Sequence, residues 1–469
     1  MMDRRQFLAG TAAAVAAAAG AACSGGDESS AETVHASMPA NLAADDEGWE
    51  EVRRQFLIPD DVIEMSALLI SSHPRSVRDA IERHRRELDR RPTEYLNEVR
   101  SENDESVLST AANYLNADRS QIALTDSTTG GLGLVYNGIH IEPGQEFLTT
   151  TQNYYSTDEA IRLRAERSGA SVRRVPLYEN AAAARPEELA ANVVKEIGPA
   201  TRVVALTWVH SSTGLKLPIK AIAQGIAELN TERKEGQEIL LAVDGVHGFG
   251  VENEKMQDLG CDYFIAGCHK WLFGPRGTGI VWASERGWQN MSPTIPTFMD
   301  GSVREAWVLE EDPSGRTTGR RFSPGGFKAF EHQWAMTEAF EFHLELGASS
   351  VQARTYELAG RLKRGLSEIG HVTLHTPLEP ELSSGIVCFE VDGMSATGVV
   401  DRLAEKRIIA TVTPYATLYA RLTPSIRNTP REIDAVLAAV GDLGKGGCNG
   451  TMRSLRERLL SFVRGYNGG

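Results

Sequence analysis

Short apolar runs alternate with amphipathic stretches through the middle of the chain. Residues 158–169 and 185–198 have the three- and four-residue spacing of apolar positions that is typical of helices. The runs expected to be strands are rich in Val, Ile, Leu and Thr and lie at 121–125, 146–150, 171–177, 201–209, 238–244 and 263–267. This alternation predicts an α/β fold with right-handed crossovers and a mostly parallel sheet.

The regular alternation of strands and helices is absent on either side of this region. Helical patterns at 75–92 and 106–116 precede it, and a long helical segment follows Phe322. A smaller α+β part then has one clear strand at 384–391 and helices after it. We expect a domain order that runs 31–60 (N-terminal segment), 61–321 (large domain), 322–443 (small domain) and 444–469 (C-terminal extension).

The first 30 residues are expected to be an export signal. Arg4 and Arg5 precede an alanine-rich run, which is the pattern of a twin-arginine signal peptide and is too weakly apolar for a membrane span. The predicted partner is the twin-arginine translocase, and the predicted location is the periplasm. Cys23 would either carry a lipid anchor or be an unpaired residue of the leader.

Composition narrows the possible partners. The 469 residues have a formal net charge of −14, which argues against nucleic acid or an anionic membrane surface as the main partner. Cys261 and Cys268 bracket a strand-like segment, so about seven residues at ~3.3 Å each keep them too far apart for a bridge. We predict no essential disulfide and no metal site.

Two residues at strand ends suggest a specific chemistry. Lys270 follows the run 263–267, and Asp244 ends the run 238–244. A lysine among apolar groups loses its proton readily and can condense with the aldehyde of pyridoxal phosphate (PLP), and a carboxylate beside the pyridine nitrogen keeps that nitrogen protonated. Each motif alone also fits an ordinary strand end or a solvated His-Lys pair. Together they predict a PLP site with Lys270 and Asp244 as catalytic residues.

A third motif could bind the phosphate. Ser127, Thr128 and Thr129 precede Gly130 and Gly131 and open an apolar helical stretch. Free N–H groups and the helix dipole at such a start favour an anion. The alternative is a plain Ser/Thr cap on a core helix. The glycine spacing is not that of a dinucleotide fingerprint.

These motifs resemble one enzyme family. The resemblance covers residues 63–439 and is carried by the segments DSTTGG, TWVHSSTG, AVDGVHG, GCHKWLFGPRGTG and YARLTPSIRNTPREID. They are similar to class V aminotransferases of the fold-type I PLP enzymes, a group that includes isopenicillin N epimerases, cysteine desulfurases and kynureninases. The resemblance implies a seven-stranded-type sheet flanked by helices, a smaller C-terminal domain and a homodimer.

The resemblance also assigns roles in cofactor binding. Thr128 and Thr129 would bind the phosphate, with His269 nearby. His247 would lie close to the ring hydroxyl and act with Lys270 and Asp244. Ser211 stands where many relatives have an asparagine that bonds to the same hydroxyl.

Arg421 matches the arginine that binds the substrate carboxylate, for which a guanidinium is well suited. Taken alone, Arg421 would more simply form a surface ion pair. In the place of a ring-stacking histidine the chain has Asn153 or Tyr154, either of which could supply a planar group.

Several departures from the family matter. Residues 407–421 contain no cysteine, and Cys388 lies in a run that indicates a buried strand, so sulfur abstraction is not expected. Val412 or Thr413 stands near the place of a second arginine. Gly267 replaces a serine that often holds the phosphate, and two glycines replace a threonine that often comes from the partner subunit.

The reaction we expect is proton movement at the Cα of a small-molecule substrate, an amino acid or an amino-acid-containing peptide. Lys270 would move that proton, giving transamination or epimerisation. One alternative is oxidative or decarboxylating modification of a secreted peptide metabolite such as a siderophore. Another is an inactive PLP-fold binding module, against which the retention of Lys270 and Asp244 weighs.

Overall fold

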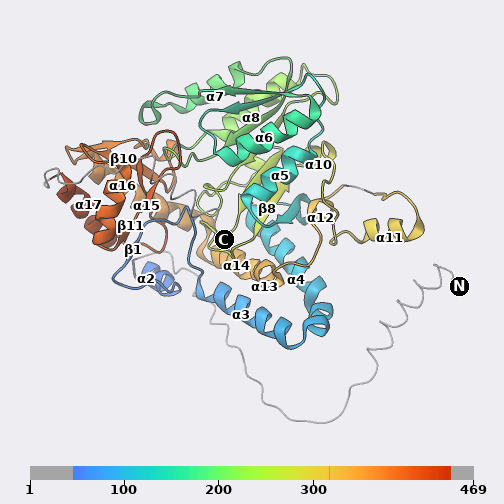
Figure 1. Cartoon of the computed structure of the whole chain (residues 1–469), viewed down its shortest axis with the longest axis horizontal. Helices are drawn as coiled ribbons and strands as arrows, with labels where there is room; N and C mark the ends of the chain where they lie inside the picture. The colour runs from blue at the N-terminus through green and yellow to red at the C-terminus, as the bar shows by residue number, and fades with distance from the viewer. Residues whose placement is uncertain (1–45, 316, 445–469) are drawn as a thin grey trace, which may run out of the picture.

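The computed structural model describes residues 46–315 and 317–444 (Figure 1). The predicted signal peptide, Cys23 and nearly all of the C-terminal extension lie outside these residues. Within them, no helix is both long and apolar enough to cross a membrane.

A seven-stranded sheet forms the centre of the large part of the molecule. Its strand order is β2-β8-β7-β6-β5-β3-β4. The bounds are β2 Ile122–Thr125, β3 Glu146–Thr150, β4 Ser171–Val175, β5 Thr201–Thr207, β6 Leu240–Asp244, β7 Tyr263–Gly267 and β8 Gly279–Ala283. The pairs among β3 to β7 are parallel, and β8 runs antiparallel to β2 and β7. The predicted α/β class and mostly parallel sheet are confirmed. β8 was not among the predicted strands.

Alternate residues of the central strands pack into separate cores on the two faces of the sheet. Leu241 and Val243 belong to one apolar cluster, whereas Leu240 and Ala242 belong to the other. Successive side chains of a strand point to opposite faces, so a strand covered on both sides is apolar throughout. This double burial explains why β6 is a continuous apolar run in the sequence.

Helices cover both faces. One cluster takes residues from α5 (Thr128–Gly138) and α6 (Tyr155–Ser168), and the other from α7 (Pro186–Lys195) and α8 (Ile219–Asn230). The pairs α5·α6 and α7·α8 each pack side by side, as Figure 1 shows. Two short helices, α9 Met256–Leu259 and α10 Glu285–Gln289, lie between strands.

The remaining helices before the C-terminal part are α2 Asp46–Arg54, α3 Arg75–Arg90, α4 Pro92–Leu115, α11 Gly301–Leu309, α12 Gly319–Phe322, α13 Phe330–Trp334 and α14 Met336–Leu346. In Figure 1, α3, α13 and α14 lie below the central sheet, α12 lies beside β8 and α11 projects to the right. The pattern at 106–116 is the end of α4, which starts at Pro92. Proline is favoured in the first turn because its missing N–H is not needed there. α13 and α14 pack against α3 and α4.

A second, antiparallel sheet lies in the C-terminal part. Its order is β12-β13-β10-β9, with β9 Val372–Leu374, β10 Val387–Val391, β12 Thr411–Val412 and β13 Ala420–Leu422. The helices are α15 Ala348–Ser367, α16 Ala396–Glu405 and α17 Pro430–Leu443. The predicted domain boundaries stay predictions. The structure adds that β1 (Ile63–Glu64) pairs with β11 (Ile408–Ile409), so the chain near residue 63 joins the C-terminal part.

Candidate active site

The carboxyl ends of β6 and β7 bring the two proposed catalytic residues to one edge of the sheet. Asp244 is the last residue of β6, and Lys270 follows the end of β7 at Gly267. These strands are parallel neighbours, with Asp244 aligned to Ile265. In open α/β sheets this edge is where ligands bind.

The charges of Asp244 and Lys270 depend on burial and on each other. Burial raises the pKa of Asp244 to about 6, while the Val246 N–H and the Lys270 charge act in the opposite direction. Burial lowers the pKa of Lys270 to about 8; Asp244 opposes this shift and Arg421 adds to it. A neutral amine is therefore much more accessible at Lys270 than at an exposed lysine.

His247 has its ring proton placed by a neighbour. The Trp271 Nε1–H donates to His247 Nδ1 at 3.4 Å. An indole is only a donor, so Nδ1 is the acceptor and the proton lies on Nε2. Burial, then the charges of Lys270, Arg421 and His269, lower the pKa of His247 well below its usual value. His247 is therefore neutral, with Nε2–H as its donor. Sequence analysis missed Trp271, although it directly follows Lys270.

The start of α5, where the motif predicts an anion cup, lies beside the end of β7. Ser127 caps the helix, because its Oγ accepts from the Gly130 N–H at 3.0 Å. The Gly267 N–H donates to Thr128 Oγ1 at 2.8 Å. The Nδ1 atom of His269 is buried and has no hydrogen-bond partner among the described residues. A buried polar atom without a partner is costly, so a hydrogen-bonding group of a ligand is expected there.

Gly267 keeps this cup open. A Cβ at this position would lie 3.0 Å from Thr128 Oγ1 and 3.1 Å from His269 Cε1. The absence of a side chain therefore leaves room for both groups to face a ligand. Thr129 lies on the exposed first turn of α5. The Gly130 and Gly267 N–H groups and the Ser127 hydroxyl are bonded within the protein, the last to Asp126 Oδ1 at 2.9 Å. The Thr128 hydroxyl and the N–H groups that open α5 are the donors that fit the phosphate of PLP, which is the group that the motif predicts.

Arg421 is a buried cation held by neutral groups. Its side chain is 3% exposed; Nη1 donates to the Ser211 carbonyl at 2.7 Å and Nε to Thr411 Oγ1 at 3.0 Å. No carboxylate forms an ion pair with it among the described residues. The alternative expectation for Arg421, a surface ion pair, is therefore wrong. A buried charge without an opposite charge is costly. A substrate carboxylate would remove that cost.

Ser211 connects Arg421 to a residue that the sequence analysis missed. Ser211 Oγ lies 2.7 Å from Tyr415 Oη, and the Tyr415 ring meets the Tyr154 ring edge-on at 6.0 Å. Tyr415 lies between β12 and β13, in the segment where the sequence lacks both a desulfurase cysteine and the family's second arginine. Its position just ahead of the proposed carboxylate-binding arginine was the available signal.

The structure separates the two alternatives for the planar group. The Asn153 amide is fully engaged: Nδ2 donates to Thr149 Oγ1 at 2.7 Å and to the Ala205 carbonyl at 3.0 Å, and Oδ1 accepts from the Thr207 N–H at 3.0 Å. Asn153 thus ties β3 to β5. Tyr154 is half-buried and faces Tyr415, so it is the better candidate to stack on the cofactor ring. Both cofactor roles stay predictions.

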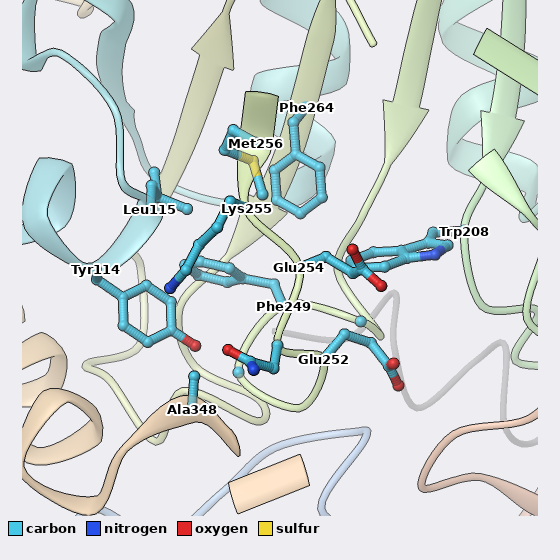
Figure 2. Close-up of a pocket in the computed structure, with 13 residues that line it drawn as sticks. Tyr114, Leu115, Trp208, Phe249, Glu252, Glu254, Lys255, Met256, Phe264 and Ala348 are labelled. Carbon is cyan, nitrogen blue, oxygen red and sulfur yellow. The ribbon is translucent and has the colours of Figure 1, made fainter. Parts of the chain in front are cut away.

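Two hollows lie apart from Lys270. Figure 2 shows the side chains around the first, including Tyr114, Phe249 and Glu252, which enclose about 10 Å³, room for little more than a water molecule. The second holds about 310 Å³ between α4 and the segment near Phe298. Neither is lined by Asp244 or Lys270. No group of three possible metal ligands lies together in the described part of the chain.

Comparison with known proteins adds a family. The Aminotransferase class-V family model matches residues 75–415. An isopenicillin N epimerase from Streptomyces clavuligerus is 28% identical over 405 residues, which cover 84% of this chain and 98% of that protein. A probable cysteine desulfurase from Halalkalibacterium halodurans is 24% identical over 335 residues, covering 67% of this chain and 76% of that protein.

Solved structures agree with the fold. A variant of C-DES with glycine covalently linked to its PLP cofactor has a TM-score of 0.75 and 22% identity, covering 83% of this chain and 99% of that one. The complex of the cystine C-S lyase C-DES with cysteine persulfide has a TM-score of 0.73 and 23% identity, covering 82% and 98%. This similarity confirms the predicted fold of PLP fold-type I.

Proposed function

The chain belongs to the class V aminotransferase family of PLP-dependent proteins, and we propose that it is an enzyme acting at the Cα of an amino acid or amino-acid-containing peptide, by transamination or epimerisation. The observation that carries this proposal is the pairing of Lys270 and Asp244 at one sheet edge, where each shifts the pKa of the other. A neutral amine can take the Cα proton, and a carboxylate beside the ring nitrogen would help the cofactor ring accept the electron pair that remains.

Different site residues would bind the different groups of PLP. Thr128, Thr129 and His269 would hold the phosphate, and Asp244 the ring nitrogen. His247 and Ser211 would meet the ring hydroxyl, with Tyr154 against the ring. When bound, PLP supplies a ring that withdraws the electron pair of a bond broken at Cα.

The protein's own residues would then place the substrate and move the proton. Arg421 would orient the substrate by its carboxylate, and Lys270, as the neutral amine, would take the Cα proton. With a pKa of about 8, Lys270 is neutral in a useful fraction of molecules near neutral pH.

The available thiols do not favour desulfuration, although desulfurases are among the relatives. Residues 407–421 contain no cysteine. The cysteines of the described residues, Cys261, Cys268 and Cys388, are free and buried. Burial raises the pKa of Cys388 to about 12, so its thiolate is scarce. A nucleophilic sulfur needs the opposite: exposure and a low pKa.

We further propose a homodimer that is exported by the twin-arginine translocase to the periplasm. Export rests on the Arg4-Arg5 pattern. Dimerisation is supported by large apolar side chains left in solvent between β8 and α13, where Trp307 and Phe327 are each 77% exposed. Exposed apolar surface of this kind often marks a protein interface.

Reconstitution with PLP tests the enzymatic proposal. The loaded protein should exchange the Cα hydrogen of at least one member of a panel of amino acids and short peptides in D2O, followed by NMR. Borohydride should fix PLP to Lys270, which peptide mass mapping can locate. Lys270→Ala should lose both signals, whereas the matched surface variant Lys220→Ala should keep them. Absence of Cα exchange across the panel in fully loaded protein would contradict the proposal.

A further inference from the structure

Tyr415 is the side chain at the site for which the proposed function so far gives no role. Its hydroxyl lies 2.7 Å from Ser211 Oγ, and its ring is held against Tyr154. The same Ser211 accepts, through its carbonyl, the 2.7 Å hydrogen bond from Arg421 Nη1. One residue therefore joins the Tyr415 hydroxyl to the guanidinium proposed to bind the substrate carboxylate.

Tyr415 and Lys270 approach the site from different parts of the molecule. Lys270 follows β7 of the central sheet, whereas Tyr415 lies between β12 and β13 of the C-terminal sheet. The charges of Asp244 and Arg421 influence the pKa of both side chains. Both side chains therefore lie near the Asp244 carboxylate and the Arg421 guanidinium, at the same site.

Inversion at Cα needs two proton-transfer groups. A hydrogen removed from one side of a carbon must be replaced from the other side for the configuration to change. Lys270 can serve one side. A second group must be near the substrate carboxylate, which is bonded to Cα itself, and must be able to give up a proton.

We propose that Tyr415 is this second group: a catalytic residue that transfers a proton to and from the substrate Cα on the side opposite Lys270, which makes the reaction an epimerisation. This proposal rests on the proposed Cα chemistry and specifies it. Lys270 takes the Cα proton and becomes an ammonium ion. The electron pair of the broken Cα–H bond stays with the substrate. The phenol of Tyr415 gives its proton to Cα and becomes a phenolate, and Cα thus regains one hydrogen with the opposite configuration.

The cycle closes when the proton on Lys270 returns to the Tyr415 oxygen through solvent and the hydroxyl of Ser211. In the reverse direction the phenolate form takes the proton and the Lys270 ammonium gives one. Burial raises the pKa of Tyr415, which the hydrogen bond with Ser211 and the Arg421 charge partly offset. The resting tyrosine is therefore the protonated donor.

The configuration and the deuterium content of the substrate after incubation distinguish a proton-transfer role of Tyr415 from a structural role. PLP-loaded protein and Tyr415→Phe are incubated in D2O with each enantiomer of a substrate found in the exchange panel. The original protein should incorporate deuterium with inversion. Tyr415→Phe should lose inversion by roughly 100-fold or more, since a positioned acid or base contributes about that much. Exchange with retention should persist for the enantiomer whose hydrogen faces Lys270.

Two further measurements guard against a merely structural effect. The Kd for PLP and the visible spectrum of the loaded protein should be unchanged in Tyr415→Phe. Tyr419→Phe, a change of the same kind in the same segment but at a ring stacked on His375 at 3.9 Å, should behave like the original protein.

The outcomes are distinct. Unchanged inversion in Tyr415→Phe would overturn the role of Tyr415, and so would a loss of inversion accompanied by equal loss of retentive exchange or of PLP affinity. An original protein that exchanges the Cα hydrogen without inversion would overturn the epimerisation and leave Cα chemistry standing. An original protein without exchange would overturn both.

Discussion

Asp244 shows at the residue scale how burial prepares a group for its role. In the cofactor-free protein its pKa is about 6, because burial disfavours the charge more than Lys270 and the Val246 N–H favour it. A cationic ring nitrogen beside the carboxylate would stabilise the charged form. The same burial that destabilises Asp244 alone thus strengthens its interaction with a cationic partner.

This shift predicts how stability depends on pH. Between about 4, the ordinary pKa of an aspartate, and about 6, the folded protein binds a proton at Asp244 that the unfolded chain has released. The unfolded state then binds fewer protons, so the free energy of unfolding falls as pH rises through this window. Asp244→Asn removes this term. The stability of the variant relative to the cofactor-free original should therefore increase from pH 4 to pH 6 and then level off, as measured by urea unfolding.

The exposed Asp258→Asn on α9 is the matched control. A pH dependence of the same size in this variant would show that the effect does not come from the burial of Asp244. A pH-independent difference for Asp244→Asn would show that the carboxyl group is not shifted by burial.

Arg421 gives a prediction about substrate binding. Its buried guanidinium has Ser211 and Thr411 as hydrogen-bond acceptors and no carboxylate partner among the described residues. Arg421→Ala should raise KM for a carboxylate substrate by roughly 30-fold or more, since hydrogen bonds to charged groups are worth about 2 kcal/mol. The corresponding substrate amide should be affected much less. Equal changes for the acid and the amide would contradict a carboxylate site, and the surface variant Arg402→Ala should affect neither.

At the scale of elements, the positions of the site residues depend on how neighbouring strands end. β3 and β5 are held together past their paired residues by the Asn153 amide, which bonds to Thr149, Ala205 and Thr207. α6 begins directly after this junction, at Tyr155. Tyr154, the N-cap of α6, is therefore placed by a neighbour whose own side chain is unavailable to a ligand.

Asn153→Ala should destabilise the protein by about 2–4 kcal/mol, because it removes several hydrogen bonds and leaves buried groups unpaired. Denaturant unfolding of the cofactor-free protein measures this loss. Asn253→Ala, at an exposed asparagine, should change stability by less than about 0.5 kcal/mol. A similarly small effect for Asn153→Ala would show that the junction does not depend on the amide.

At the scale of the whole molecule, a polar cluster around the buried Glu252 carboxylate connects the two parts of the chain. Glu252 accepts hydrogen bonds from Lys216 at 2.9 Å, Tyr356 at 2.7 Å, Gln352 at 3.0 Å and Ser384 at 2.6 Å. Lys216 and Glu252 belong to the loops of the central sheet, and the other three lie on α15 and just before β10. The cluster therefore fixes how the part that carries Arg421 and Tyr415 sits on the part that carries Lys270.

Glu252→Gln keeps the shape of the side chain but leaves the partly exposed Lys216 amine without its carboxylate. It also removes an acceptor from the buried centre of the cluster, which costs about 1–3 kcal/mol, so thermal unfolding should occur at a lower temperature. Turnover should also fall, because the relative position of Arg421 and Lys270 depends on this cluster. Glu254→Gln, at an exposed glutamate two residues away, is the control, and equal Tm values for the two variants would contradict the role of Glu252.

The sequence alone was sufficient for the features that are local. Apolar runs ending in Asp244 and before Lys270, and hydroxyls opening a helix at Thr128, predict the α/β class, the parallel strands and the residues proposed to hold PLP, because strand burial and helix capping depend on neighbouring residues. β8 was missed because its glycine-rich approach resembles a loop, and the choice between Asn153 and Tyr154 depended on hydrogen bonds to other strands.

The tertiary structure decided the contacts between distant residues. Ser211 and Tyr415 are separated by 204 positions, yet their hydroxyls lie 2.7 Å apart. The position of Tyr415 just ahead of Arg421 is a signal in the sequence, but the contact of its hydroxyl with Ser211 comes from the packing of the C-terminal part against the central sheet. The sequence by itself determined which chemistry the central sheet can support. The packing of the C-terminal part determined that Arg421 and Tyr415 lie beside Ser211 at the end of the central sheet, because contacts between distant residues depend on the whole arrangement of buried surfaces.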